Sequence, residues 1–425
     1  MRIESVRATP GVAAFYSDDQ RAIKAGAERD GFAYDGEPVT DGFDRVREPG
    51  ESLLIELDLS DGSVVRGDCA AGQYAGAGGR DPPLDPERAK KAVEGPLADR
   101  LVGRRVDDFG EAVESLSTDD HTGVRYGVSA ALLAAAARAT RTTRTDVLAD
   151  HLGTDPATEP IPVFGQSGER RRENAEKMCL RGTPVLPHGL FNSREAVGAD
   201  GENLRSYLAW LSERARELGQ PGYEPHLHVD VYGLLGDIFG EPYDGDHLVS
   251  YFADLADAAA PFALQVEGPM DAGEAVDEAP TDARDEQIRA LATLREALGE
   301  ASVEVDLVAD EWCNTLEDVE AFVDAAAADV VQIKTPDLGG LQRSARAVRY
   351  CEGTPVRSYL GGTCNETATS ARACAHVALA TDADQVLAKP GMGFDEGYTV
   401  VTNEMRRTLA RRADAERAAT TEVPR

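Results

Sequence analysis

The chain has 425 residues, and its 76 Asp and Glu residues outnumber its 44 Lys and Arg residues, which gives a formal net charge of −32 at pH 7. Such an acidic surface repels a phosphate backbone, so nucleic acid is not expected as a partner. The length exceeds that of one ordinary small domain, and it suits an α/β barrel accompanied by a second domain.

The acidic residues are scattered through apolar segments such as 254–260 and do not form one tail. We therefore expect a folded chain with a solvated acidic surface. Charge repulsion on this surface opposes folding in dilute buffer, whereas molar salt shortens the Debye length to about 3 Å and screens the repulsion. The composition thus predicts a halophilic protein.

The six cysteines lie at irregular spacings without a Cys-x-x-Cys pair. In a chain of this size the pattern favours reduced thiols in a cytoplasmic protein over a disulfide framework. The first residues, Met-Arg-Ile-Glu-Ser-Val, contain no apolar signal core, and no run approaches the roughly 18 apolar residues of a membrane span. We expect a protein that is neither exported nor bound to a membrane.

The first part of the chain, 1–155, is predicted to be an α+β domain. Residues 3–9 and 51–59 are expected to form strands, the second alternating in hydropathy up to a turn. Helical patterns follow at 86–98 and 127–140. The second of these is alanine-rich and apolar on nearly every face, which indicates a helix buried between two domains.

From residue 161 onward, short apolar strands alternate with amphipathic helices, of which 284–298 is the clearest. This alternation predicts a parallel sheet with helical crossovers. Eight strands suit a closed barrel, although a doubly wound open sheet would show a similar repeat. We assign 156–412 to the barrel and 413–425 to a polar C-terminal tail. The expected strands are 162–164, 185–186, 226–232, 262–267, 303–309, 330–334, 356–360 and 385–387.

Three carboxylates lie at or just beyond the ends of successive predicted strands: Asp230, Glu267 and Asp310. Active sites of barrels form at this end of the strands, and three oxygen ligands with open positions suit octahedral Mg²⁺. Any one of them could instead cap a helix or pair with a surface base, but three in register favour a metal site. Glu311, next to Asp310, is a rival ligand.

A lysine, Lys334, ends the predicted strand 330–334 and shares one face of it with Gln332. Burial and a nearby cation lower the pKa of a lysine, so Lys334 is a candidate base for taking a proton from carbon. The alternative is a lysine that reaches solvent from the strand end.

One histidine, His188, follows another predicted strand and is a second acid/base candidate, although a lone histidine is more often structural. Alternation places His226, His228 and Asp230 on one face of their strand, and we expect a structural hydrogen-bonding role for the two histidines. The glycine-rich run 72–81 lacks the strand and helix of a nucleotide-binding loop, and we expect a mobile lid or an ordinary loop there.

Eight longer motifs accompany these residues. They are Gly-Asp-Cys-Ala-Ala-Gly-Gln-Tyr (67–74), Phe-Gly-Gln-Ser-Gly (164–168), Asp-Val-Tyr-Gly (230–233), Glu-Gly-Pro-Met-Asp (267–271), Val-Ala-Asp-Glu-Trp-Cys-Asn-Thr (308–315), Val-Gln-Ile-Lys-Thr-Pro-Asp-Leu-Gly-Gly (331–340), Gly-Gly-Thr-Cys-Asn-Glu-Thr (361–367) and Leu-Ala-Lys-Pro-Gly-Met-Gly (387–393). With them the chain resembles the enolase superfamily and, within it, the methylaspartate ammonia-lyase family, over about residues 10–412.

The resemblance implies an enolase-superfamily modified TIM barrel with an N-terminal α+β capping domain. It implies elimination of ammonia from L-threo-3-methylaspartate, through an enolate intermediate, to give mesaconate. Mg²⁺ would be the metal and K⁺ a monovalent activator. The family also suggests a homodimer, an amino dicarboxylate substrate, and a glutamate mutase as pathway neighbour.

Position by position, the resemblance makes Asp230, Glu267 and Asp310 the metal ligands. Lys334 becomes the base for the usual epimer, and His188 the acid/base group on the opposite face. The remaining matches are contacts to the substrate or residues that line its pocket, and these are Gln166, Gln332, Thr363, Cys364, Gln73 and Leu387.

The chain departs from the family near the histidine. The family usually has Pro-His-Ala-Leu-Ile-Asn-Asn, where this chain has Pro-His-Gly-Leu-Phe-Asn-Ser. Gly189 and Phe191 put the pocket shape and substrate range in question. Two other functions stay open: a dehydratase or racemase of the same superfamily acting on a related dicarboxylate, and a barrel that binds dicarboxylates without turning them over.

The charge of the chain generates the first prediction. The free energy of unfolding should rise as KCl or NaCl increases from about 0.1 M to molar concentration, because screening removes the repulsion between acidic side chains. Unfolding by urea at each salt concentration, followed by circular dichroism, measures the change. A fold equally stable at low and molar salt would contradict the halophilic interpretation.

Overall fold

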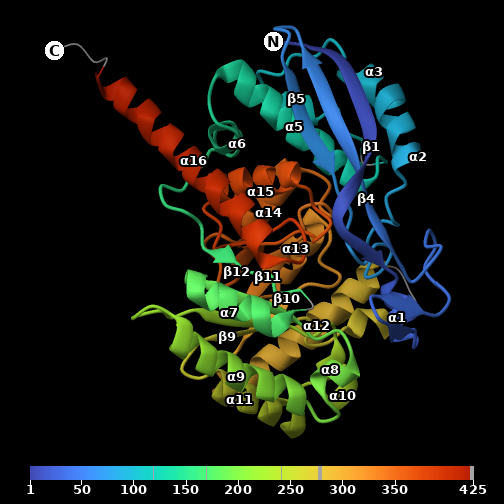
Figure 1. Cartoon of the computed structure of the whole chain (residues 1–425), viewed down its shortest axis with the longest axis vertical. Helices are drawn as coiled ribbons and strands as arrows, with labels where there is room; N and C mark the ends of the chain where they lie inside the picture. The colour runs from blue at the N-terminus through green and yellow to red at the C-terminus, as the bar shows by residue number, and fades with distance from the viewer. Residues whose placement is uncertain (118, 169, 241, 276–279, 422–425) are drawn as a thin grey trace.

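A computed structural model describes residues 1–421, apart from 118, 169, 241 and 276–279. Figure 1 shows an N-terminal cap of long strands and helices beside a barrel, with helix α16 reaching away from the barrel towards the C-terminus. All six cysteines are buried and free. Among the described residues, no helix has the length and apolarity needed to cross a bilayer.

The cap is built on an antiparallel sheet with the order β1-β4-β5. Its strands are β1 (Ile3–Asp18), β4 (Arg47–Leu59) and β5 (Val64–Cys69), and β2 (Glu28–Asp30) and β3 (Ala33–Asp35) form a separate hairpin. The strands expected at 3–9 and 51–59 therefore exist and pair with each other. The helices of the cap are α1 (Gln20–Lys24), α2 (Pro86–Ala92), η1 (Val93–Leu97), α3 (Ala98–Leu101), α4 (Phe109–Val113), α5 (Thr122–Thr140) and α6 (Arg144–Leu152).

Helix α5 is the alanine-rich segment that was expected to be buried, and 14 of its residues are buried. It lies against β5 through two glycines. A Cβ atom on Gly67 would lie 2.1 Å from the carbonyl oxygen of Gly127, so the backbones approach more closely than any side chain permits. On its other side, the Tyr126 hydroxyl donates to Glu366 of the barrel at 2.8 Å. The helix thus packs between the two parts of the molecule.

The second part is a closed barrel of parallel strands in the order β10-β11-β12-β13-β6-β7-β8-β9. Closure confirms the barrel and excludes the open sheet. The strands are β6 (Val163–Phe164), β7 (Val185–Leu190), β8 (His226–Asp230), β9 (Leu264–Glu267), β10 (Asp306–Ala309), β11 (Val330–Ile333), β12 (Arg357–Leu360) and β13 (Gln385–Leu387). Strand β7 continues four residues beyond its predicted end, and this extension carries His188.

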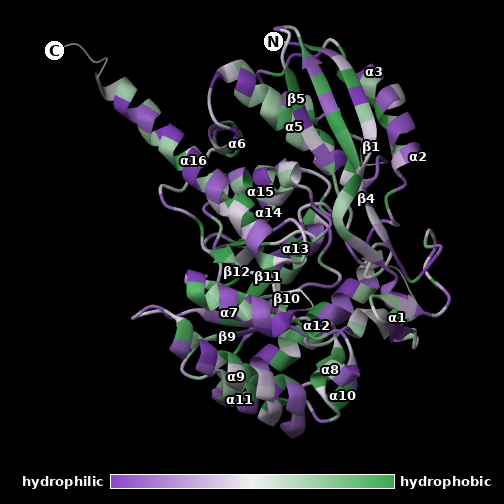
Figure 2. Ribbon diagram, viewed as in Figure 1, coloured by the Kyte–Doolittle hydropathy of each residue, from purple (hydrophilic) through white to green (hydrophobic). Residues whose placement is uncertain are grey.

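Helices surround the barrel. They are α7 (Arg171–Arg181), α8 (Arg194–Val197), α9 (Glu202–Leu218), α10 (Leu234–Phe239), α11 (Asp246–Ala259), η2 (Ala272–Ala275), α12 (Pro280–Glu300), α13 (Leu316–Asp324), α14 (Leu341–Cys351), α15 (Ala368–Thr381) and α16 (Phe394–Thr421). Figure 2 shows hydrophilic and hydrophobic residues alternating along outer helices such as α9 and α11, as amphipathic helices require.

The interior of the barrel is filled by side chains and leaves only its mouth for chemistry. A separate buried apolar cluster occupies it, formed by Phe164, Val185, Val308, Val330, Tyr359 and Leu387. Residues 413–421 of the expected polar tail continue helix α16, whereas 422–425 lie outside the described residues. The division at 155 and 412 stays a prediction.

Candidate active site

The three predicted metal ligands meet at the mouth of the barrel. Asp230 ends β8, Glu267 ends β9, and Asp310 directly follows β10. The parallel register pairs Asp230 with Glu267, so neighbouring strands deliver their carboxylates to the same height. Ligand oxygens of the three residues lie within 4.8 Å of one another. An all-oxygen set of this size fits Mg²⁺.

Burial and mutual repulsion raise the free energy of ionising the carboxylates of this cluster when no counter-charge is present. Burial, followed by the charges of Glu267 and Asp310, raises the pKa of Asp230 well above its usual value. Burial also raises the pKa of Asp310 to about 7, despite the opposing charge of Lys334. Carboxylates that are this hard to ionise side by side fit a divalent cation among them.

Lys334 directly follows β11 and enters the cluster, as predicted from its strand. Its Nζ lies 2.5 Å from Oδ1 of Asp310. The direction of its pKa differs from the expectation. Burial and then Arg80 lower the pKa of Lys334, but Asp310, Glu311 and Asp337 together outweigh them and raise it. The sequence pattern suggested a cation beside this lysine but did not indicate that several carboxylates would surround it.

His188 reaches the same mouth from the opposite wall. Strands β7 and β11 are four places apart in the ring of eight, so His188 and Lys334 face each other across the barrel. A register shift between Leu186 and Gly189, with a φ of +44° at His188, turns the side chain inward. Its Nε2 lies 3.5 Å from Oδ2 of Asp230 and 3.4 Å from Oε2 of Glu267.

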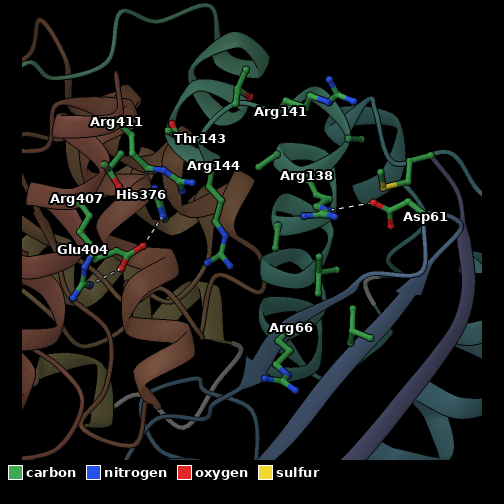
Figure 3. A pocket seen from close by; sticks show the side chains of 18 of the residues that line it. Asp61, Arg66, Arg138, Arg141, Thr143, Arg144, His376, Glu404, Arg407 and Arg411 are labelled. Atoms are coloured by element: carbon green, nitrogen blue, oxygen red, sulfur yellow. Dashed lines mark hydrogen bonds and ion pairs between the residues drawn. The ribbon is translucent and has the colours of Figure 1, made fainter. Parts of the chain in front are cut away.

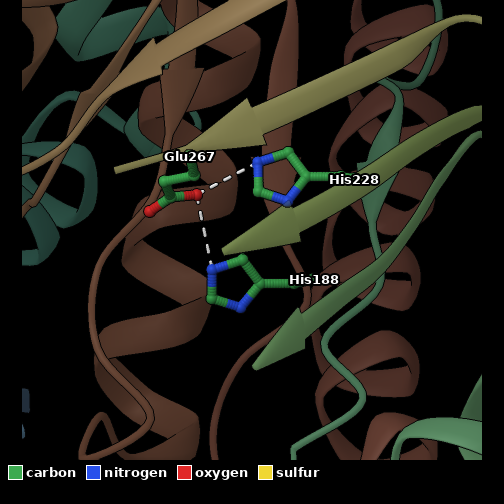
Figure 4. Close-up of side chains that lie close together, drawn as sticks. All are labelled: His188, His228 and Glu267. Carbon is green, nitrogen blue, oxygen red and sulfur yellow. Dashed lines mark ion pairs between the residues drawn. The ribbon is translucent and has the colours of Figure 1, made fainter. Parts of the chain in front are cut away.

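The two histidines of β8, His228 and His226, lie in different environments. His228 is fully buried, and its Nε2 lies 3.0 Å from Oε2 of Glu267, beside His188 (Figure 4). Burial lowers the pKa of His228 to about 4, although Glu267 opposes the shift. His226, at the start of the strand, is only partly buried. Glu267 itself has a lowered pKa, because His188 and His228 outweigh the effect of burial.

The other predicted residues line the same small cavity, of about 60 Å³. Gln332 donates from Nε2 to Oε1 of Glu267 at 2.6 Å. Cys364 donates from Sγ to Oε1 of Gln73 at 3.2 Å. Oε1 of Gln166 is buried and has no hydrogen-bond partner among the described residues. Thr363 and Leu387 complete the predicted set around this cavity, and the role of each residue stays a prediction.

Arg80, which the sequence did not single out, ends the glycine-rich part of the 72–81 loop and closes over the mouth. Its side chain is 3% exposed, with Nη2 2.8 Å from Oε2 of Glu311 and Nε 3.1 Å from Oδ2 of Asp337. Burial raises the pKa of Glu311, but Arg80 and the other cations lower it to about 2. Glu311, the rival ligand, pairs with Arg80 and lies outside the two metal-ligand clusters found among the described residues.

Arg80, Asp337 and the aromatic residues Tyr74 and Tyr232 are functional-site residues that sequence reasoning missed. The rings of Tyr74 and Tyr232 meet edge to face, with centroids 5.5 Å apart, and form one wall of the cavity. Arg80 is the single basic residue in the glycine-rich run 72–81, and this was the available sequence signal for its role in the site. Asp337 gave none, because its relation to the loop arises only from the contact between cap and barrel.

The unusual residues next to His188 lie behind the strand. Phe191 meets Tyr207 of α9 edge to face, with ring centroids 5.2 Å apart, and neither Gly189 nor Phe191 lines the small cavity. A Cβ atom at Gly189 would lie 3.3 Å from the Phe191 ring. The larger ring at 191 therefore uses space left by the glycine at 189, and the two departures compensate each other.

A much larger hollow, of about 1230 Å³, lies between the cap and α16 (Figure 3). Six arginines line it, and two of them, Arg138 and Arg407, pair with Asp61 and Glu404. Neither of the two groups of metal-ligating side chains found among the described residues lies there. A hollow of about 1670 Å³ beside Arg21 and Arg171 is larger still, so size does not identify the site. The convergent carboxylates, lysine and histidine identify the barrel mouth instead.

The fold and site define a capped barrel of the enolase superfamily. The fold is shared with muconate lactonizing enzyme from Pseudomonas fluorescens, at a TM-score of 0.60 and 16% identity, covering 94% of this chain and 89% of that one. Family models described as the methylaspartate ammonia-lyase N-terminus and C-terminus match residues 1–153 and 155–414. The chain belongs to the methylaspartate ammonia-lyase family.

Relatives of the chain are similar to it over nearly its full length. Methylaspartate ammonia-lyase from Haloarcula marismortui is 63% identical, covering 100% of this chain and 99% of that one. The magnesium complex of β-methylaspartase from Clostridium tetanomorphum has a TM-score of 0.88 and 44% identity, over 98% of this chain and 100% of that one. The Citrobacter amalonaticus enzyme, solved with (2S,3S)-3-methylaspartic acid, has a TM-score of 0.90 and 46% identity, over 96% and 99%. The expected halophilic character follows from the Haloarcula relative.

The buried pairing of Arg80 generates the second prediction. Arg80→Met should lower the free energy of unfolding by about 3 to 5 kcal/mol, because it leaves buried carboxylates without their counter-charge. The matched control, Arg66→Met, removes a surface ion pair with Glu56 of 2.9 Å and should change stability far less. Urea unfolding in molar KCl compares the two variants, and equal losses would contradict the assignment.

Proposed function

We propose that this chain is a Mg²⁺-dependent methylaspartate ammonia-lyase that converts L-threo-3-methylaspartate to mesaconate and ammonia. The observation that carries the proposal is the arrangement of Lys334 and His188 on opposite walls, with Asp230, Glu267 and Asp310 between them. This arrangement occurs in a chain whose relatives bear that activity in their names.

The proposed metal ligands are Asp230, Glu267 and Asp310. When bound, Mg²⁺ supplies positive charge beside the substrate carboxylate on which negative charge develops. Asp310, Glu311 and Asp337 raise the pKa of Lys334, whereas burial and Arg80 lower it. A metal ion on Asp310 would neutralise one of these carboxylates and add a positive charge, and both changes would lower the pKa of Lys334 towards the neutral amine that a base requires.

The proposed chemistry is removal of the C3 proton by Lys334. The C3 position lies next to the C4 carboxylate, into which the electron pair delocalises before the C2–N bond breaks and ammonia leaves. His188 faces the other side of C3 and serves the 3-epimer. Gln166, Gln332, Thr363 and Cys364 hold the substrate carboxylates and amine, while Gln73 and Leu387 shape the pocket around them.

Further proposals follow from family membership and composition. K⁺ acts as a monovalent activator, the enzyme is a homodimer in the cytoplasm, and a glutamate mutase is its neighbour in the pathway. No nucleic acid or membrane takes part. A related dehydratase or racemase would share the first proton transfer, but it would expel a hydroxyl group or return the proton, and a silent barrel would release nothing.

One assay tests the activity and the metal together. Mixing the protein with 3-methylaspartate in molar KCl should produce the ultraviolet absorbance of the conjugated product, chelation should abolish it, and Mg²⁺ should restore it. Replacing K⁺ by Na⁺ at equal ionic strength tests the activator. Full activity in excess chelator would exclude the metal assignment, and no absorbance from metal-loaded, folded protein would exclude the lyase.

The opposed bases generate a prediction about stereochemistry. Lys334→Ala should reduce kcat on the threo (2S,3S) substrate by roughly 10² to 10⁴, which is the usual contribution of general-base catalysis. His188→Ala should chiefly reduce turnover of the 3-epimer and any epimerisation, with a smaller loss on the threo substrate. Measuring kcat for both epimers in both variants decides the matter. A dead His188→Ala beside an active Lys334→Ala on the threo substrate would reverse the base assignment.

A further inference from the structure

Glu267 belongs to a second cluster of metal-ligating side chains, formed with His188 and His228 (Figure 4). The three residues come from adjacent strands β7, β8 and β9. His228 and Glu267 are fully buried, and His188 is 6% exposed. His188 and Glu267 line the small cavity, and His228 lies behind them with no exposed surface.

The polar atoms of this cluster are close together but unsatisfied. Oε2 of Glu267 lies 3.0 Å from Nε2 of His228 and 3.4 Å from Nε2 of His188. Even so, both ring nitrogens of each histidine and Oε2 of Glu267 lack a hydrogen bond of normal geometry among the described residues. Buried polar atoms in proteins are rarely left without a partner, so these five atoms are candidates for binding a ligand.

The spacing is that of ligands around one metal ion. Zinc binds imidazole nitrogen and carboxylate oxygen at about 2.0 to 2.2 Å, which places neighbouring ligands about 3.0 to 3.5 Å apart. The distances of 3.0 and 3.4 Å fall in this range. We propose that His188, His228 and Glu267 form a second metal site, which binds a transition-metal dication such as Zn²⁺.

The ligand types distinguish this site from the carboxylate triad. Imidazole favours zinc and its neighbours among the transition metals, whereas an all-oxygen set favours Mg²⁺. Glu267 is common to both sites, and His188 cannot transfer protons from a nitrogen that holds a metal. Bound Zn²⁺ therefore blocks the His188 side of the cavity. The site itself does not depend on the proposed reaction, because metal binding is measured directly.

The experiment titrates metal-free protein with Zn²⁺ by calorimetry in molar KCl. His228→Gln should weaken binding by at least about tenfold, the lower end of the effect of disturbing a metal site. His226→Gln is the matched control, because it replaces the same side chain two positions earlier on the same strand, outside the cluster, and it should bind as the wild type does. Asp310→Asn, which disrupts only the triad, should weaken Zn²⁺ binding less than His228→Gln does.

Bound Co²⁺ gives a second readout, because its visible spectrum reports imidazole ligation. The spectrum should change in His228→Gln and in His188→Gln, and stay the same in His226→Gln. The His188 variant serves where loss of the buried His228 prevents folding. Absence of Zn²⁺ binding to the wild type would overturn the site. Equal binding by wild type and the folded cluster variants, or loss in Asp310→Asn alone, would place any zinc elsewhere and overturn it as well.

Discussion

Three carboxylates buried at one end of a barrel impose the constraint around which this structure is arranged. Each of Asp230, Glu267 and Asp310 is nearly inaccessible to water, and their charges raise one another's cost of ionisation. Lys334 brings a positive charge to Asp310, and the imidazoles of His188 from β7 and His228 from β8 lie against Glu267. The three carboxylates are therefore a ligand set that suits a divalent cation.

The cap also contributes to the balance of charges at the barrel mouth. Arg80 pairs with Glu311, the residue after Asp310, and with Asp337, three residues after Lys334. Gln73 of the same loop accepts from Cys364 on the far side of the mouth. Below them, Tyr126 of α5 reaches Glu366, which is paired with the fully buried Lys389 at 2.8 Å. The loop and the helix therefore hold the cap to the same strand ends that carry the site.

The repeating elements of the fold could be predicted from the local sequence pattern. The eight strands, the buried α5 and the strand-end positions of the carboxylates follow from periodicity, because a parallel strand must present its last residue at the same rim as its neighbours. Three features of the site could not be predicted from the sequence pattern. The bulge that turns His188 inward depends on packing against β8, and the pairing of Arg80 depends on how the cap docks. The direction of the pKa of Lys334 depends on carboxylates brought from three separate segments.

The charges of this chain, whose formal net charge is −32 at pH 7, are of two kinds, exposed and buried. Surface charges act through a screened solvent, so molar salt reduces both their repulsion and the value of exposed pairs such as Arg7 with Glu56. Buried pairs such as Lys389 with Glu366, both fully inaccessible, are screened far less. Removing either partner would leave an uncompensated charge in the interior. In molar salt, the electrostatic interactions that keep their strength are therefore those of the interior, where the carboxylates of the barrel mouth also lie.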